Sequence, residues 1–302
     1  MRLTRIEKLN EFIEGGIMTF KFNRFLLIFS LMILALGLSL TSCQKNEASS
    51  GPAADQGLVT VKITDSPFPL KWFAQVDVTI TKIELHTVDS TRHGSFVTVW
   101  EGHQSVNLLE LRNGETSDFP QAAVPAGRYN MIRLKMDSVH IVYKNGVEFS
   151  LKLPDRMKAG LRIVIVPPVE VQEGDSTSVL LDFDLSKSLV IRGGWHQNFP
   201  GMGFLSFRPV IRAVSMHKTG SIMGFVSDTS GVALADAQII VKADTVVTNA
   251  FTNRRGFYKV MGLPVGSYSV EVEKDGYQWQ EAENVKVNKH QATIRNFELI
   301  PQ

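Results

Sequence analysis

The chain has 302 residues, of which 44% are hydrophobic and 21% are charged, and it has a single cysteine. This length predicts about two domains of roughly 100–200 residues each, and the apolar fraction excludes a wholly disordered chain. The lone cysteine excludes an intrachain disulfide, a CxxC redox motif and a multi-cysteine zinc site. The 32 basic and 30 acidic side chains leave a net charge of +2, which gives no indication of nucleic-acid binding.

The N-terminal segment has the pattern of a signal peptide. Lys21 and Arg24 precede the uncharged run FLLIFSLMILALGLSL at 25–40. This run is shorter than the roughly 20 residues of a spanning helix and closer to the apolar region of a signal peptide. Residues 1–42 are therefore expected to be a signal peptide. Because residues 1–17 carry three glutamates, which are unusual ahead of such a run, we expect translation to start at Met18.

The apolar run ends in Leu40-Thr41-Ser42-Cys43, where the only cysteine of the chain follows small residues. This resembles the lipobox of bacterial lipoproteins. The resemblance implies that Cys43 is diacylglycerated, becomes the mature N-terminus and anchors the protein to a membrane. The alternative is an ordinary signal peptide or anchor in which the cysteine falls there by chance.

The residues after Cys43 form a short polar tether. Gln44-Lys45-Asn46-Glu47 is similar to the surface-export signal of some Gram-negative lipoproteins, although Asn46 stands where an acidic residue is preferred. Ser, Gly, Pro and Ala follow, so 43–56 is expected to be a lipidated N-terminus and flexible tether. The expected location is the bacterial cell envelope, at the outer membrane, with the leaflet and surface display left open.

Beyond residue 57 the sequence predicts an all-β fold. Short runs rich in Val, Ile, Leu, Thr and Phe, such as 58–64, 76–86 and 129–136, alternate with Gly, Pro, Asn and Asp. Asn145-Gly146 between two such runs predicts a tight hairpin, because both residues tolerate positive φ. We therefore expect two β-sandwich domains in tandem.

Residues 57–217 are similar to a family of bacterial lipoprotein domains, the domain of unknown function 4382. The similarity rests on segments that occur in the family's order, namely VKITDSP at 61–67, VDVTITKIE at 76–84, VNLLEL at 106–111, PAGRYNMIRL at 125–134, LDFD at 181–184 with KSL at 187–189, and PVIR at 209–212. The resemblance implies a β-sandwich and no established activity.

Residues 218–302 resemble the carboxypeptidase regulatory-like domain. The similarity rests on GFV at 224–226, TNRRGFY at 252–258, LPVGSY at 263–268 and Gly276-Tyr277, with Asn253 where the family usually has Asp. The resemblance implies a transthyretin-like sandwich of the carbohydrate-binding-like fold group, used as an accessory module. No zinc-ligand motif of a carboxypeptidase is present, so the resemblance does not imply peptidase activity.

The sequence shows no catalytic motif. Its seven histidines form neither HxH nor HExxH, and no GxSxG, P-loop or GxGxxG occurs. We expect a protein that is not an enzyme and needs no cofactor.

Three aspartates are candidate metal ligands. Asp182 and Asp184 share one face of a predicted strand and could bind calcium or act as an acid/base pair. The alternatives are a solvated strand face or pairing with Arg208 or Arg212. Asp65, before Ser66-Pro67, is predicted to be a turn residue bonded to nearby backbone amides, with a ligand role as the alternative.

Aromatic residues in predicted loops are candidate ligand-binding residues, because sugars stack on flat aromatic faces. They are Trp72, Trp195, Phe199 and Trp279. The alternative is that they pack over the ends of the domains. The expected function is a membrane-anchored, non-catalytic binding module for a glycan or a partner protein. The alternatives are an envelope assembly component or a hydrolase that uses Asp182 and Asp184. The ligand and the oligomeric state are left open.

Overall fold

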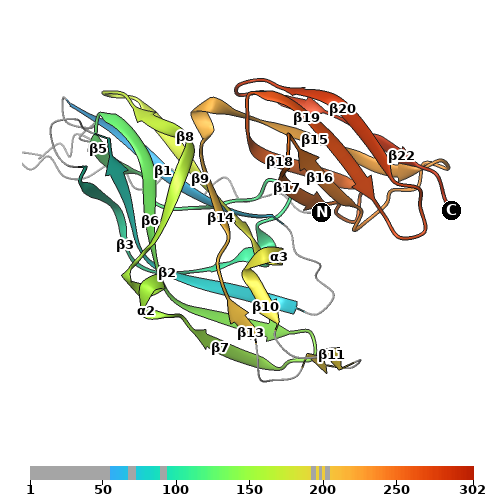
Figure 1. Ribbon diagram of the computed structural model, residues 1–302, viewed down its shortest axis with the longest axis horizontal. Helices are drawn as coiled ribbons and strands as arrows, with labels where there is room; N and C mark the ends of the chain where they lie inside the picture. The colour runs from blue at the N-terminus through green and yellow to red at the C-terminus, as the bar shows by residue number, and fades with distance from the viewer. Residues whose placement is uncertain (1–54, 67–72, 89–93, 192–194, 197–198, 201–204) are drawn as a thin grey trace, which may run out of the picture. The chain divides into compact units, whose positions relative to one another are not determined.

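The computed structural model describes residues 55–66, 73–88, 94–191, 195–196, 199–200 and 205–302 (Figure 1). The predicted signal peptide, Cys43 and most of the tether lie outside these residues, so the lipid anchor stays a prediction. Residues 51–302 belong to one compact unit. The described part is mostly β and forms two β domains, as predicted. Its helical segments are short: η1 (Leu108–Glu110), α2 (Asp155–Ala159), α3 (Leu185–Ser188) and η2 (Met216–Lys218).

The N-terminal β domain contains a ten-stranded sheet. The strand order is β3-β2-β6-β8-β14-β9-β1-β4, with β5 beside β1 and β7 beside β6. The strands are β1 (Gln56–Ser66), β2 (Phe73–Thr87), β3 (Phe96–Asn107), β4 (Ser117–Asp118), β5 (Ala122–Pro125), β6 (Gly127–Tyr143), β7 (Glu148–Lys152), β8 (Leu161–Val171), β9 (Ser176–Asp184) and β14 (Ile211–Ser215). Two two-stranded sheets complete the described part of the domain: β10 (Leu189–Ile191) pairs with β13 (Leu205–Phe207), and β11 (Trp195–His196) pairs with β12 (Phe199–Pro200).

The core of this domain follows from strand alternation. In β1 the side chains of Val59, Val61 and Ile63 are fully buried, whereas Thr60 and Lys62 point to the other face. One half of the sheet contains β3, β2, β6 and β8, and the other contains β14, β9, β1 and β4. The register pair Ile165–Ala213 of β8 and β14 joins the two halves. Buried side chains from both halves belong to one apolar cluster. The sheet therefore encloses a single core, although the expected sandwich suggested two separate sheets.

The C-terminal β domain contains two four-stranded sheets. One has the order β18-β15-β21 with β22 also paired to β15, and the other has the order β17-β16-β19-β20. The strands are β15 (Thr219–Asp228), β16 (Gln238–Lys242), β17 (Val246–Phe251), β18 (Phe257–Pro264), β19 (Gly266–Glu273), β20 (Gln280–Val287), β21 (Ala292–Ile294) and β22 (Phe297–Leu299). Buried side chains of both sheets form one apolar cluster. Burial of each large aliphatic side chain stabilises such a core by about 1.5–3 kcal/mol.

Both domains contain the same Pro-x-Gly-x-Tyr turn, at 125–129 and 264–268. The hydroxyl of Tyr129 donates to the carbonyl of Pro125, and that of Tyr268 to the carbonyl of Pro264, each at 2.7 Å. Burial raises the pKa of Tyr129 to about 12 and also raises the pKa of Tyr268. Each hydroxyl therefore keeps its proton at neutral pH and holds its turn against the start of the next strand.

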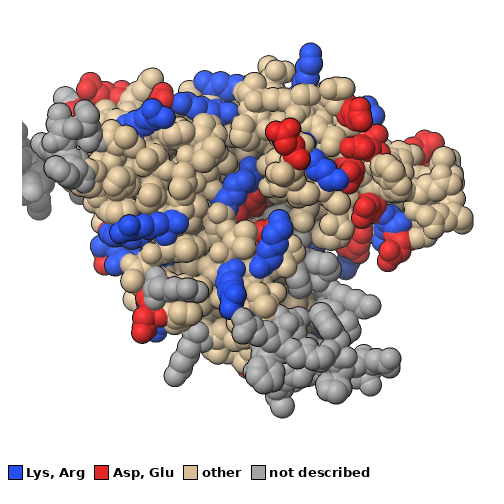
Figure 2. Space-filling model, in the orientation of Figure 1, with Lys and Arg blue, Asp and Glu red and all other residues tan. Residues whose placement is uncertain are grey.

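The outer surface carries charges of both signs. On the face shown in Figure 2, basic and acidic side chains both occur among a majority of uncharged ones. This agrees with the near balance of 32 basic and 30 acidic residues in the sequence. Among the described residues, no helix is long and apolar enough to cross a membrane.

Candidate functional site

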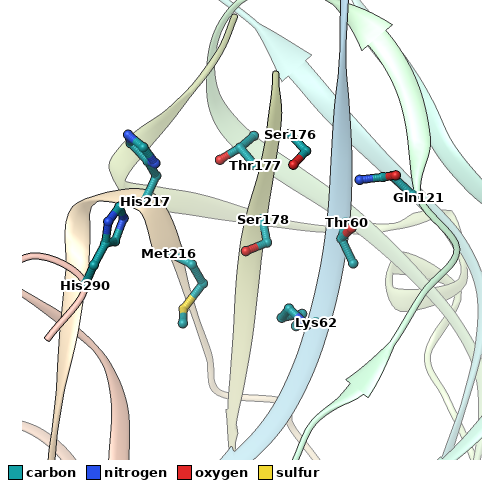
Figure 3. A pocket seen from close by; sticks show the side chains of 9 residues that line it. All are labelled: Thr60, Lys62, Gln121, Ser176, Thr177, Ser178, Met216, His217 and His290. Carbon is teal, nitrogen blue, oxygen red and sulfur yellow. The ribbon is translucent and has the colours of Figure 1, made fainter. Parts of the chain in front are cut away.

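A pocket of about 400 Å³ lies against the outer face of β1 and β9. Most of its lining side chains carry a hydroxyl, an amide or a basic group, and we call it the hydroxyl pocket (Figure 3). It is lined by Thr60, Lys62, Gln121, Ser176, Thr177, Ser178, Met216, His217 and His290.

Strand register builds the floor of the hydroxyl pocket. β1 and β9 run parallel, and Thr60 is the register partner of Ser178, so the two hydroxyls share one face of the sheet. Lys62 lies two residues further along the same face and forms an ion pair with Asp118 of β4. The polar alternation in these strands therefore gives the domain a hydroxyl-bearing outer surface above an apolar inner one.

The hydroxyl of Thr177 is buried and has no hydrogen-bond partner among the described residues. In Figure 3 its oxygen points to the side on which His217 lies. A buried hydroxyl without a partner costs about 1–3 kcal/mol. We therefore expect this hydroxyl to bind water or a ligand group.

Two histidines lie at one end of the hydroxyl pocket, opposite Gln121 (Figure 3). The rings of His217, from η2, and His290, from the turn after β20, are 4.8 Å apart in an edge-to-face arrangement. The Lys289 ammonium lies 3.1 Å from Nε2 of His217. An ammonium group only donates, so this contact is a hydrogen bond in the tautomer of His217 whose Nε2 carries no proton.

A second recess, of about 250 Å³, shares Ser176, Thr177 and His217 with the hydroxyl pocket. Its other lining residues are Glu170, Gln172, Asp175, Lys218 and Lys289. Lys218 donates to Glu170 at 2.8 Å, and this bond lowers the pKa of the Glu170 carboxyl. The carboxylates of this region thus lie in the second recess, whereas no described carboxylate lines the hydroxyl pocket.

Of the three predicted aspartates, Asp65 and Asp182 line one small recess of about 20 Å³, whereas Asp184 does not line it. Asp182 accepts hydrogen bonds from Arg212, at 2.7 Å from Nη2 and 3.2 Å from Nε, so its pairing with Arg212 is confirmed. Asp184 caps α3, where its Oδ1 accepts the backbone amide of Lys187 at 3.1 Å and the hydroxyl of Ser186 at 2.5 Å. In the described ranges, no group of three or more His, Cys, Asp or Glu side chains could hold a metal ion.

The prediction that Asp65 is a turn residue bonded to nearby amides is wrong. Asp65 lies inside β1, is 4% exposed, and its Oδ1 accepts the amide of Leu185 at 3.3 Å, far along the chain. Its register partner is Phe183, whereas that of Asp182 is Thr64, so the two carboxylates start from opposite faces of the sheet. Burial, followed by the charge of Asp182, raises the pKa of the Asp65 carboxyl well above its usual range.

Only one of the four aromatic candidates has a described side chain. Trp279, in the C-terminal domain, is 64% exposed, so it does not pack over the end of that domain. Trp195 and Phe199 lie in the β11–β12 hairpin, where their register partners are Pro200 and His196, but their side chains are outside the described part. Trp72 also lies outside it.

The hydroxyl pocket was missed from the sequence. Its residues come from strands and turns that are distant in the chain, and a polar alternation such as that of Thr60 and Lys62 also describes an ordinary solvated strand face. The available signal was the second polar row in β9, at Ser176 and Ser178, together with histidines at both 217 and 290.

Two family matches cover most of the described part. Residues 56–199 match the family described as domain of unknown function (DUF4382), and residues 221–300 match the carboxypeptidase regulatory-like domain. The chain has a DUF4382 domain followed by a carboxypeptidase regulatory-like domain. A comparison of this two-domain chain with curated proteins gives no match.

Several solved structures align with the two-domain chain at low similarity. The Bacillus anthracis TIE protein aligns with 12% identity and a TM-score of 0.24, over 82% of this chain and 34% of the other. The shaft pilin SpaA of Lactobacillus rhamnosus GG aligns with 11% identity and a TM-score of 0.22, over 82% of this chain and 98% of the other. A 3-chlorocatechol 1,2-dioxygenase from Rhodococcus opacus aligns with 12% identity and a TM-score of 0.22, over 28% of this chain and 60% of the other. The chain thus spans less than two thirds of the TIE protein and of the dioxygenase, and TM-scores in this range do not indicate a shared fold.

Proposed function

We propose that this protein is a non-catalytic binding module, anchored to the bacterial cell envelope through a lipid on Cys43, and that it binds a glycan in the hydroxyl pocket. The observation that carries the proposal is the lining of this pocket, where hydroxyl, amide, ammonium and imidazole groups surround about 400 Å³. Small-molecule sites in proteins are about 300–1,000 Å³ in volume. A short saccharide segment suits both the size and the many hydrogen-bonding groups.

The polar floor favours a polyhydroxylated ligand over an apolar one. Thr60 and Ser178 present neighbouring hydroxyls that can both donate and accept, as sugar hydroxyls do. Thr177, whose register partner is the buried Val59, also lines the pocket, and its hydroxyl has no partner among the described residues. A ligand that fills the pocket without satisfying these groups would leave them desolvated at a cost of about 1–3 kcal/mol each.

The arrangement of carboxylates supports a role without catalysis. Glycoside hydrolysis needs two carboxyl groups that flank the substrate bond. Within the described ranges no carboxylate lines the hydroxyl pocket, Asp182 is paired with Arg212, and Asp184 caps α3. The hydrolase alternative therefore has no support from the two carboxylates on which it depended.

Glycan binding can be tested on an array with the full-length chain. We expect retention of a subset of glycans by the wild type and its loss in the double variant Thr60→Val with Ser178→Ala. Ser267→Ala, an exposed serine of β19, is the matched control and should bind as the wild type does. Absence of any glycan signal from the wild type would overturn the proposed ligand class and direct attention to a partner protein.

Anchoring is tested separately by Cys43→Ser. We expect the wild type in the membrane fraction and the variant in the soluble fraction, with a diacylglyceryl adduct on Cys43 detected by mass spectrometry of the wild type. An unmodified cysteine in the mature protein would overturn the lipid anchor without bearing on glycan binding.

A further inference from the structure

We propose that the hydroxyl pocket selects glycans that carry an anionic group, a carboxylate or a sulfate, and that this group binds at the border with the second recess, between His217 and His290 of the pocket and Lys289 of the recess. The inference rests on the proposed glycan binding and adds the charge of the ligand. It assigns one end of the pocket to the anion and the hydroxyl floor to the rest of the saccharide.

The first observation is the partner of Lys289. Lys62 and Lys218 are ion-paired with Asp118 and Glu170, respectively. Within the described ranges, by contrast, the ammonium of Lys289 contacts the imidazole of His217 and has no carboxylate within 4.0 Å. Lys289 lines the second recess, beside the His217 that this recess shares with the hydroxyl pocket. A cation that is not neutralised by a carboxylate is suited to binding an anionic ligand.

The second observation is the convergence of three nitrogen-bearing side chains. His217 and His290 lie 4.8 Å apart between rings, and Lys289 is next to His290 in sequence and 3.1 Å from His217. His290 has a φ of 58°, a left-handed conformation that is uncommon for a residue with a side chain. The turn thus places its imidazole beside that of His217 at the end of the pocket shown in Figure 3.

The third observation is that the two carboxylates nearest to Lys289 already have partners. Glu170 and Asp175 line the second recess together with Lys289, and neither lines the hydroxyl pocket. Glu170 accepts a hydrogen bond from Lys218, and Asp175 accepts the amide of Ser176 at 2.7 Å. An anion that approaches Lys289 from the hydroxyl pocket would therefore meet His217 and His290 without displacing a carboxylate from that pocket.

The test is calorimetric titration of the full-length chain with three probes: an oligouronate, its neutral methyl ester and inorganic sulfate. We expect the oligouronate to bind about tenfold more tightly than its ester. Lys289→Ala should weaken oligouronate binding about tenfold and leave ester binding unchanged. Lys144→Ala, which removes an exposed lysine from the β6–β7 turn, is the charge-matched control.

The outcomes separate this inference from the proposed function. Equal binding of the oligouronate and its ester would overturn anion selection and leave glycan binding intact. An equal loss in Lys289→Ala and Lys144→Ala would overturn the assignment of the anion to this end of the pocket. Binding of sulfate alone would show an anion site without a saccharide site, and would overturn both proposals.

Discussion

Asp182 and Arg212 form an ion pair between the neighbouring strands β9 and β14, with Nη2 and Oδ2 2.7 Å apart. The same guanidinium donates to the carbonyl of Gly262 and, at 3.1 Å, to that of Met261, both in β18 of the C-terminal domain. Thr248 of β17 donates to Asp182 at 3.3 Å. A pair within one domain therefore also organises hydrogen bonds to the other.

Removal of this arginine should destabilise the protein strongly. The side chain of Asp182 is 7% exposed and that of Arg212 is 23% exposed, so Arg212→Ala leaves a buried charge without its partner. Such a loss typically costs about 3–5 kcal/mol. We expect a fall of this order in the free energy of unfolding in urea, and separate transitions for the two domains if the pair couples them.

An exposed ion pair provides the control. Asp137 and Lys158 are 3.8 Å apart with side chains 55% and 48% exposed, so Lys158→Ala should cost less than about 1 kcal/mol. Equal losses in Lys158→Ala and Arg212→Ala would show that Arg212 acts as an ordinary surface residue.

Gly262 is the position at which an added methyl group should disturb the same region. It has a φ of +66°, and a Cβ there would lie 2.8 Å from Leu180 and 2.9 Å from Val214 of the N-terminal domain. Gly262→Ala should therefore add an overpacking cost of about 1–3 kcal/mol to the strain of the left-handed backbone. Thermal unfolding measures the total.

Gly276 is a matched control for backbone strain, because its φ is +80° and no described atom lies within 4 Å of the place that a Cβ would take. Gly276→Ala should lower stability by the left-handed strain alone, about 1–2 kcal/mol. A Gly262→Ala variant no less stable than Gly276→Ala would contradict the close packing of Gly262 against Leu180 and Val214.

The two Pro-x-Gly-x-Tyr turns predict matching effects in the two domains. Tyr129→Phe and Tyr268→Phe each remove the donor to a proline carbonyl and keep the ring, so each should cost about 1–3 kcal/mol in chemical unfolding. Tyr277→Phe is the control, since Tyr277 is only partly buried and bonds through its backbone. A neutral result at both turns would show that solvent replaces these bonds without cost.

These turns also show what can be predicted from the sequence. Proline, glycine and tyrosine at fixed spacing, and the alternation of Val59, Val61 and Ile63, are local patterns whose structural consequence depends on a few neighbours. These local patterns were sufficient to predict two β domains. The parallel pairing of β1 with β9 is not local, because the register depends on how the whole chain packs.

The candidate site was harder to predict from the sequence for the same reason. Thr60, Ser178, His217 and His290 meet only through that packing, and each by itself has an ordinary strand or turn environment. For Asp65, a local pattern gave a wrong prediction. Its neighbours Ser66 and Pro67 predicted a turn, but strand β1 continues through Asp65, and the carboxylate is buried.

The burial of Asp65 predicts an unusual pH dependence. Because its pKa is raised in the folded state above the unfolded value of about 3.9, the folded state holds the extra proton between the two values. Its contribution to stability is therefore lost as the pH rises through this window. The Asp65→Asn side chain cannot ionise, so the variant does not lose stability in this window, and its amide oxygen can still accept the hydrogen bond from Leu185. The free energy of unfolding of the variant relative to the wild type should therefore increase from about pH 4 upwards.

Glu84 gives the opposite sign and serves as the comparison. Arg133 donates to it at 2.5 Å and lowers its pKa, so its contribution is present above the unfolded value of about 4.3 and is lost as the pH falls through the folded value. Glu84→Gln should therefore cost most near neutral pH and least in acid. Urea unfolding of both variants and the wild type from about pH 3 to pH 7 measures the two differences. If the Asp65→Asn difference falls with rising pH as the Glu84→Gln difference does, the Asp65 carboxylate is stabilised in its charged form, and the assigned effect of burial on its pKa is wrong.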